Sequence, residues 1–403
     1  MCESCINKGI NDEQPEKRYR LSEFFDANWE KYISEEGVRV TIEQFKAVSA
    51  IRVCRTATLG VDYYVCTECG EQTEIYHNCR NRFCPTCSWG DTMKWASKIE
   101  GQMMKVPHRH VVFTLPHALI PLIKSNGKEL LNIFLRTSAD TFKDWVEHKY
   151  KVKVGVIAVL HTFGETKEYH PHVHMIVSWG GIDLITKSLR TIKGEYVNYE
   201  FLQNKFRNKF TDELVRLYNS EKLQHKFEDK ISMLRFLKQI NKTSWSIHLE
   251  PPMPAPSAVI RYIGRYSKRA CLSERKITEI DGEYISFRHK DYKVIGQDNK
   301  PVERILKLHY SEFFPRLLQH VPLAYFRLVR YYGVYSTKRS IPEEYLNKES
   351  EEEEEWEWEN PFICNICKKR REYMYTVIDM RTRKERTDKF DHVLHPSYKF
   401  KRA

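Results

Sequence analysis

The chain has 403 residues, which is enough for two or three domains with hydrophobic cores. Its formal net charge is +12 at pH 7, which suits a polyanionic partner but also fits a basic protein without one. No run of 18 or more apolar residues occurs, so we do not expect a membrane span. The polar N-terminus MCESCINKGINDEQPEKRYR is unlike a signal peptide, so we expect a cytoplasmic protein.

Changes in composition divide the chain into four blocks. Residues 1–53 are expected to be helical, and residues 54–104 contain six cysteines. Residues 105–340 form a long central block, and residues 341–403 combine an acidic run, a CxxC pair and a basic tail. The acidic run holds eight glutamates between positions 349 and 359. We interpret it as a solvated linker rather than a mimic of DNA.

The central block contains both strand and helix patterns. Residues 109–116, 152–163 and 170–179 are rich in β-branched side chains and predict strands. The polar segment GETKEY between the last two predicts a hairpin. Residues 130–148 predict a helix.

Two CxxC pairs in the cysteine-rich block indicate zinc. Cys66-x2-Cys69 and Cys84-x2-Cys87 are separated by 14 residues, and two such turns can complete a tetrahedron of thiolates around one ion. The chain shows no sign of secretion, so metal binding is favoured over disulfides.

Other candidate ligands lie close to these pairs. Cys54, Cys79, His77 and Asp62 could build a second zinc site. Cys54 could equally be buried in the core as a small hydrophobic residue, as unpaired cysteines usually are.

Two further CxxC pairs each supply half a site. Cys364-x2-Cys367 near the C-terminus and Cys2-x2-Cys5 near the N-terminus could join each other. The C-terminal pair could instead recruit the histidines of the basic tail. Spacing alone does not choose between these arrangements.

The motif HPHVH at residues 170–174 is the most informative stretch. On a strand, alternate side chains share a face, so His172 and His174 would point to the same side. Two imidazoles and a third ligand can hold a divalent metal with open positions for a phosphate oxygen. A set of ordinary hydrogen-bonded histidines is the alternative. The candidates for the third ligand are His161, which a hairpin would bring close, Glu165 and His170.

A tyrosine pair follows the proline-rich segment PPMPAP. Ser257 is a suitable N-cap for a helix over residues 257–270, on which Tyr262 and Tyr266 share one face. A tyrosine can attack DNA and form a 5′-phosphotyrosine link that is kept for rejoining. Aromatic pairs at this spacing usually belong to a core, but basic residues crowd this helix. We predict that the tyrosines are nucleophiles and that DNA contacts come from Arg80, Arg82, Arg265, Lys268 and Arg269.

Together these motifs resemble those of the two-tyrosine HUH rolling-circle transposases of the insertion-sequence-91 family, which are related to Helitron and to Rep and relaxase HUH nucleases. The resemblance runs from about residue 40 to residue 335 and covers most of the chain. It is carried by CRTATLG, NCRNRFCPTC, HVVFTLPH, LHTFGETKEYHPHVHMIVSWGG, YIGRYSKR, FRHKDY and YYGVYS. One departure is Asp62, where a histidine is expected before Tyr63.

The resemblance implies an α+β fold with an N-terminal zinc-binding domain. Residues 54–104 would be the zinc-binding DNA-recognition domain, and residues 105–340 the HUH endonuclease domain with a central antiparallel, ferredoxin-like sheet flanked by helices. His172 and His174 match the metal-binding pair. Tyr262 and Tyr266 match the nucleophiles.

The resemblance also implies an activity and its cofactors. The chain would be a transposase that nicks and rejoins single-stranded DNA at the ends of a mobile element, with Mg²⁺ or Mn²⁺ for catalysis and structural Zn²⁺. Its partners would be element ends and target DNA in the prokaryotic cytoplasm, associated with the nucleoid. Because no GxxxxGK[ST] loop occurs, strand separation would require a host helicase.

Two other functions fit parts of the pattern. A plasmid or phage replication initiator, or a relaxase, would use the same chemistry. The cysteine-rich block before the central block favours the transposase. A zinc-dependent DNA-binding regulator would bind DNA without cutting it, and would keep its activity without Tyr262 and Tyr266.

Overall fold

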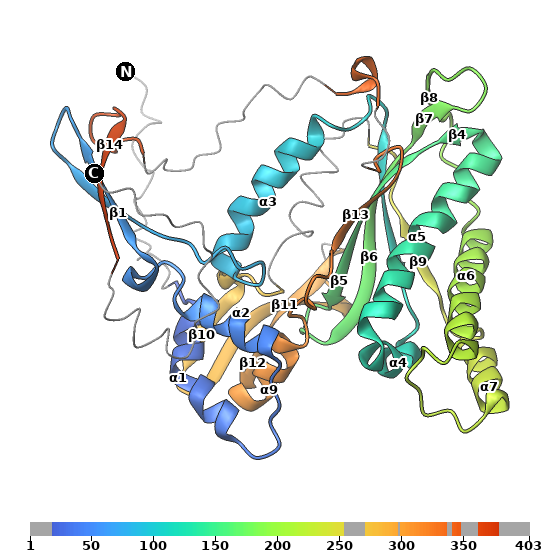
Figure 1. The fold of residues 1–403 in the computed structure, drawn as a ribbon, viewed down its shortest axis with the longest axis horizontal. Helices are drawn as coiled ribbons and strands as arrows, with labels where there is room; N and C mark the ends of the chain where they lie inside the picture. Colours follow the sequence, from blue (N-terminus) through green and yellow to red (C-terminus); the bar gives the residue numbers. More distant parts are fainter. Residues whose placement is uncertain (1–17, 254–270, 297–298, 337–340, 348–361, 379–403) are drawn as a thin grey trace, which may run out of the picture.

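The structure, a computed structural model, describes residues 18–253, 271–296, 299–336, 341–347 and 362–378 (Figure 1). These residues combine helices with antiparallel sheets, so the α+β class is confirmed. The helix predicted over residues 257–270 lies outside the described part of the chain, together with both of its tyrosines. None of the helices in the described ranges is long and apolar enough to cross a bilayer.

A five-stranded antiparallel sheet forms the centre of the larger core. Its strands, in spatial order, are β13 (Val329–Gly333), β5 (Gly155–Phe163), β6 (Tyr169–Ser178), β3 (His108–Thr114) and β9 (Ser246–Leu249). Helix α5 (Gly127–Tyr150) connects β3 to β5, and α6 (Tyr199–Asn219) lies between β6 and β9. This strand–helix–strand–strand–helix–strand order is the ferredoxin-like arrangement, with β13 added at one edge. The ferredoxin-like sheet implied by the family resemblance is therefore present.

Helices cover both faces of this sheet (Figure 1). On one face α5 and α6 form the main core, in which the rings of Phe113 and Phe206 lie 4.9 Å apart. On the other face α3 (Pro85–Glu100) packs Ala96 and Ile99 against β5 and β6. Strand β5 is buried almost throughout because both of its faces are covered. The remaining elements of this half are α4 (Ile120–Ser125), α7 (Lys230–Ile240), β4 (Val152–Lys153), β7 (Gly180–Asp183) and β8 (Leu189–Thr191).

A second core joins the N-terminal helices to a segment from late in the chain. It contains α1 (Leu21–Ser34), α2 (Ile42–Arg52), α9 (Tyr310–Leu318), β10 (Ile277–Asp281), β11 (Tyr284–Ile295) and β12 (Pro301–His309). The rings of Phe25 and Phe314 stack 5.0 Å apart. The Glu274 carboxylate accepts hydrogen bonds from the backbone of Leu21 and the hydroxyl of Thr86. The expected block boundaries at residues 53 and 104 thus do not separate independent cores.

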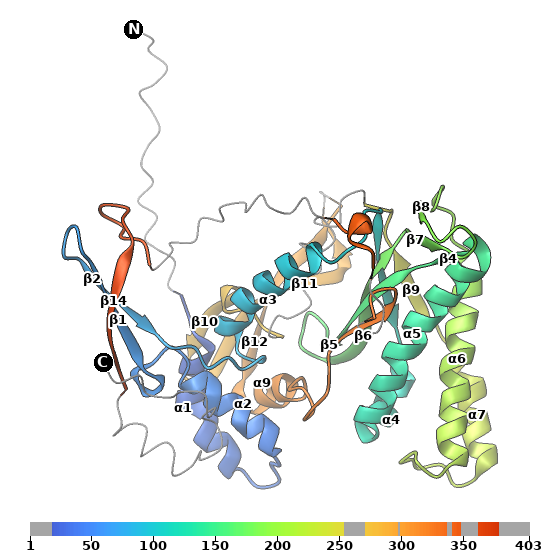
Figure 2. The same cartoon turned by 45° about the horizontal axis from the view of Figure 1, so that its top comes forward.

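A third sheet lies at the far end of the molecule from the five-stranded sheet in both views (Figures 1 and 2). Its order is β14 (Arg371–Val377), β1 (Val61–Cys66) and β2 (Gln72–Tyr76), and both pairings are antiparallel. The C-terminal block therefore returns to the cysteine-rich block. The boundary expected at residue 340 therefore divides this sheet, because β14 lies in the C-terminal block whereas β1 and β2 lie in the cysteine-rich block.

Candidate metal centres and nucleic-acid interface

Three histidines meet on neighbouring strands β5 and β6. His161 lies directly opposite His172, and His174 follows two residues later on the same face. The nearest nitrogen atoms of the three rings all lie within 4.8 Å of one another. Val173, between the two histidines of β6, is fully buried against the opposite core. The predicted hairpin is confirmed, and its register brings His161 to the HxH pair.

The other two candidates for a third ligand lie outside this group of nitrogen atoms. The Glu165 carboxylate lies 2.8 Å from Nζ of Lys276 and accepts a hydrogen bond from the backbone of Lys290. The backbone carbonyl of His170 accepts a hydrogen bond of 2.7 Å from Nδ1 of His172, which leaves Nε2 of His172 as the candidate ligand atom. His161 belongs to the metal-compatible group with His172 and His174, whereas Glu165 and His170 do not, so the geometry favours His161 as the third ligand.

The cluster favours neutral imidazoles. Burial lowers the pKa of His172 to about 4. Burial, reinforced by the neighbouring imidazoles, holds the pKa of His174 well below its ordinary value. A metal binds the neutral imidazole, so both rings are in the binding form at neutral pH without losing a proton first.

Behind His174 lies a buried histidine that contacts a half-buried carboxylate. Nε2 of His110, on β3, is 2.8 Å from Nδ1 of His174, and Nδ1 of His110 is 3.3 Å from the Glu250 carboxylate. One assignment of protons suits this arrangement: His174 donates from Nδ1 to Nε2 of His110, and the proton of a neutral His110 then lies on Nδ1, the nitrogen nearest the Glu250 carboxylate. Nε2 of His174 then presents its lone pair to a metal, as in sites where an outer hydrogen bond orients the ligand.

Sequence reasoning missed His110 and Glu250. A signal for His110 was present, because it lies in the strand pattern HVVFTLPH. On β3 it is two residues before Val112, the residue paired with His174, so the two histidines share a face. Glu250 carries no such signal, since only the pairing of β9 with β3 brings it close.

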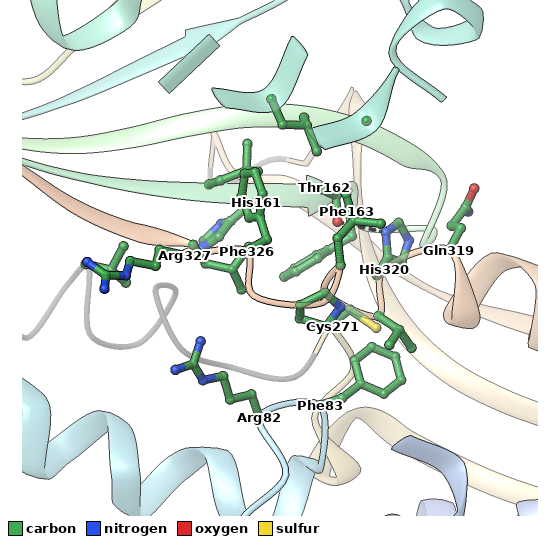
Figure 3. A pocket seen from close by; sticks show the side chains of 18 of the residues that line it. Arg82, Phe83, His161, Thr162, Phe163, Cys271, Gln319, His320, Phe326 and Arg327 are labelled. Carbon is green, nitrogen blue, oxygen red and sulfur yellow. Dashed lines mark hydrogen bonds between the residues drawn. The ribbon is translucent and has the colours of Figure 1, made fainter. Parts of the chain in front are cut away.

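A cavity of about 970 Å³ borders the histidine cluster. Figure 3 shows Arg82 and Phe83 on one side, with His161 and Phe163 on the strand side and Cys271 between them. Its described lining includes aromatic rings and no carboxylate, and its basic residues are Arg80, Arg82, Lys98, Lys124 and Arg327. Such a lining suits a polyanion that carries planar bases.

The predicted basic loop lies at this cavity. Arg80 and Arg82 are both exposed and line it. The side chain of Asn81, between them, turns back and accepts a hydrogen bond from the backbone of Phe83. The other predicted DNA contacts, Arg265, Lys268 and Arg269, lie outside the described residues.

The loop is attached to one of two cysteine clusters. Cys54, Cys79, Cys84 and Cys87 bring their sulfur atoms within 4.8 Å of one another. Cys84 is the N-cap of α3 and is fully buried, and Cys87 lies in the first turn of that helix. Hydrogen bonds from the three neighbouring thiols lower the pKa of Cys54. Four convergent thiols at the N-terminus of a helix suit one tetrahedral zinc ion.

The second cluster combines Cys66 and Cys69 with Cys364 and Cys367. The prediction that the pairs at 66–69 and 84–87 surround one ion is therefore wrong. Strand β2 is the reason, because its five extended residues carry the chain back from the 66–69 turn before residue 84 is reached.

His77 and Asp62, considered as spare zinc ligands, contact each other instead. Nε2 of His77 lies 2.8 Å from the Asp62 carboxylate. Nδ1 of His77 lies 3.0 Å from the carbonyl oxygen of Leu59. Neither residue belongs to the metal-compatible clusters of the described chain.

Comparison with known proteins defines the class of the chain. The family model "Transposase zinc-binding domain" matches residues 24–115, and the model "Putative transposase" matches residues 155–341. The putative transposase y4qJ of Sinorhizobium fredii is 29% identical over 298 residues, 72% of this chain and 74% of the relative. The transposase for insertion sequence element IS801 of Pseudomonas savastanoi is 26% identical over 345 residues, 82% of this chain and 79% of the relative. No solved structure matches the chain.

These matches identify a transposase, a DNA-processing enzyme with a zinc-binding domain. The chain thus combines a transposase zinc-binding domain of the insertion-sequence-91 type with a transposase domain, a combination consistent with the insertion-sequence-91 family.

Proposed function

We propose that this transposase nicks and rejoins single-stranded DNA at the ends of its mobile element by rolling-circle transposition. Tyr262 and Tyr266 are the nucleophiles, and each attack transfers the 5′-phosphate of the cut strand to the phenolic oxygen while the 3′-hydroxyl leaves. Reversal of this exchange on a second DNA end rejoins the strands without an external energy source. A host helicase supplies the single strands, because the chain has no nucleotide-binding P-loop.

The meeting of three imidazoles beside a basic, aromatic cavity carries this proposal. His161, His172 and His174 fit a divalent ion such as Mg²⁺ or Mn²⁺, which when bound would polarise the scissile phosphate. His110 and Glu250 keep the His174 ring in the orientation that ligation requires. The cavity, which Arg80 and Arg82 help to line, admits the strand.

We propose that zinc at Cys54, Cys79, Cys84 and Cys87 fixes the basic loop in place. The loop runs from Cys79 to Cys84, so its two ends are ligands of one ion. A loop held in this way presents Arg80 and Arg82 to phosphates with little loss of entropy on binding.

Covalent trapping tests the function directly. The full chain is incubated with Mn²⁺ and labelled single-stranded oligonucleotides from the ends of its own element, and denaturing gels detect a protein–DNA adduct. The wild-type protein is expected to form the adduct. The Tyr262→Phe/Tyr266→Phe protein should form none, whereas Tyr325→Phe, which removes a fully exposed hydroxyl, should behave as wild type.

A binding assay separates loss of chemistry from loss of the substrate. His172→Ala should abolish the adduct but retain affinity for the oligonucleotide, because binding depends on the basic surface. A double tyrosine variant that still becomes linked to a 5′-phosphate would exclude these nucleophiles. A double variant that keeps every activity would favour a regulator that binds DNA without cutting it.

A further inference from the structure

We propose that Cys66, Cys69, Cys364 and Cys367 bind a second zinc ion that fastens strand β14 to the zinc-binding domain. We call this four-cysteine site the zinc clasp. The two family models match residues 24–115 and 155–341, so the second pair of cysteines lies outside both. This inference goes beyond the proposed function, and it does not depend on DNA cleavage.

The sulfur atoms of the zinc clasp have the spacing of a tetrahedral metal site. The distance from Cys66 to Cys367 is 3.3 Å, that from Cys69 to Cys364 is 3.5 Å, and that from Cys69 to Cys367 is 3.9 Å. Zinc–sulfur bonds of about 2.3 Å place ligand sulfurs about 3.8 Å apart. A disulfide would require about 2.05 Å, and none of the four cysteines forms one.

The two CxxC turns have the same backbone structure, although they lie at opposite ends of the chain. The backbone N–H of Cys66 donates to the carbonyl of Glu71, and that of Gly70 donates to Cys66. In the second turn Cys364 donates to Lys369, and Lys368 donates to Cys364.

The two turns also share a left-handed residue at the same position. Gly70 has φ +73°, and Lys368 has φ +59°, each one residue after the second cysteine of its pair. A lysine rarely adopts this conformation. Its presence at the equivalent position means that the second turn repeats the backbone shape of the first, as two halves of one metal site would.

The sheet around the clasp has almost no hydrophobic core. In β14 only Arg371 is buried, and the six residues after it are exposed. In β1 only Val61 and Cys66 are buried. A small sheet with so little buried apolar surface is marginal in water, whereas a tetrathiolate zinc site contributes its binding free energy to folding.

A buried cation lies beside the clasp. The side chain of Arg371 is 3% exposed, and its guanidinium pairs with the Glu71 carboxylate at 2.7 Å. The same group donates to the carbonyl of Ile363, inside the second turn. The Glu71 carboxylate also lies 2.8 Å from Sγ of Cys364, so Arg371 offsets the negative charge that this carboxylate adds beside the thiolates.

The clasp also fixes the far end of the acidic run. Before the run, the backbone N–H of Asn347 donates to Met103, and Leu346 forms a β-bridge with Met104. After it, residues 362–377 are held by the clasp and by pairing with β1. The described segments on both sides of the run are thus attached to the rest of the fold.

Metal analysis of matched variants tests the zinc clasp. The wild-type full chain should contain two zinc ions per chain by mass spectrometry of the metal. The Cys364→Ser/Cys367→Ser protein should contain one. The control Cys2→Ser/Cys5→Ser removes the other unassigned CxxC pair and should retain two. Two zinc ions in the first variant, loss of one in the control, or iron in place of zinc would each overturn the proposal.

Hydrogen exchange of the wild-type protein gives an answer that does not require a folded variant. Stepwise addition of a chelator such as EDTA should remove protection from the amides of residues 371–377, and added zinc should restore it. Protection that persists after all zinc has been removed would show that β14 does not need the metal. Because neither readout uses DNA, a failure of the clasp is distinguishable from a failure of the proposed nuclease activity.

Discussion

Nε2 of His110 lies 2.8 Å from Nδ1 of His174, with the Glu250 carboxylate on the far side of His110. This contact orients a proposed metal ligand from a strand that does not itself contribute one. His110→Ala should therefore weaken Mn²⁺ affinity about 10- to 100-fold, the usual cost of losing such an outer partner. Titrating Mn²⁺ in the cleavage assay measures the change.

His248→Ala is the matched control for this prediction. His248 lies on β9, and Nε2 of its exposed ring is 3.9 Å from the same carboxylate. Its loss should leave the Mn²⁺ requirement unchanged. Equal Mn²⁺ requirements for His110→Ala and wild type would rule out a positioning role for His110.

The identity of the third ligand gives a second prediction. His161→Ala should raise the Mn²⁺ concentration needed for cleavage at least about tenfold, because a two-histidine site with one outer partner binds more weakly. Glu165→Gln should not, since its carboxylate pairs with Lys276. Isothermal titration of Mn²⁺ into each of the two variants measures binding directly and distinguishes the two candidate ligands. The reverse pattern would transfer the ligand role to Glu165.

Local patterns predicted most of the nuclease half of the fold. The alternation of residues 170–174 gave the common face of His172 and His174, and the polar GETKEY segment gave the hairpin that brings His161 to them. Helix α5 extends the predicted helix at both ends. These features depend on neighbours along the chain, which a single sequence contains.

Features that depend on distant contacts were not predictable in the same way. The 14-residue spacing of two CxxC pairs is compatible with one zinc site made by all four cysteines. Only the pairing of β1 with β2 and β14 places the two pairs in different clusters. Cys66 and Cys364 are brought together across most of the chain, and no local pattern encodes such a contact. Glu250 reaches His110 for a similar reason, through the pairing of β9 with β3.

The basic loop at the cavity predicts a change in salt dependence. Arg82→Ala should weaken binding to single-stranded DNA and reduce the slope of log affinity against log salt by about 0.7, the value for one lost phosphate contact. Fluorescence anisotropy at several salt concentrations measures both quantities. Arg216→Ala, on an exposed part of α6 where the arginine pairs with Glu213, is the control and should leave the slope unchanged. An unaltered slope for Arg82→Ala would remove this residue from the interface.

The last prediction concerns the dependence of stability on pH. His320 is buried at the cavity, where Nδ1 lies 3.0 Å from the Thr162 hydroxyl and Nε2 lies 3.0 Å from the Lys167 carbonyl. The neutral ring satisfies both contacts by accepting at Nδ1 and donating at Nε2. Burial lowers its pKa to about 4, whereas the unfolded chain has the ordinary value of about 6.5.

Acid therefore protonates His320 in the unfolded chain first. The stability that the neutral ring contributes is full above about pH 6.5 and is lost as the pH falls toward about 4, because the unfolded state binds more protons. At pH 5 the loss from this residue is about 2 kcal/mol. Urea unfolding at pH 7.5 and pH 5 should show that His320→Gln loses less stability on acidification than wild type, by about that amount. His225→Gln, at an exposed position, should lose as much as wild type. An equal loss in the His320→Gln protein would mean that this ring does not couple folding to pH.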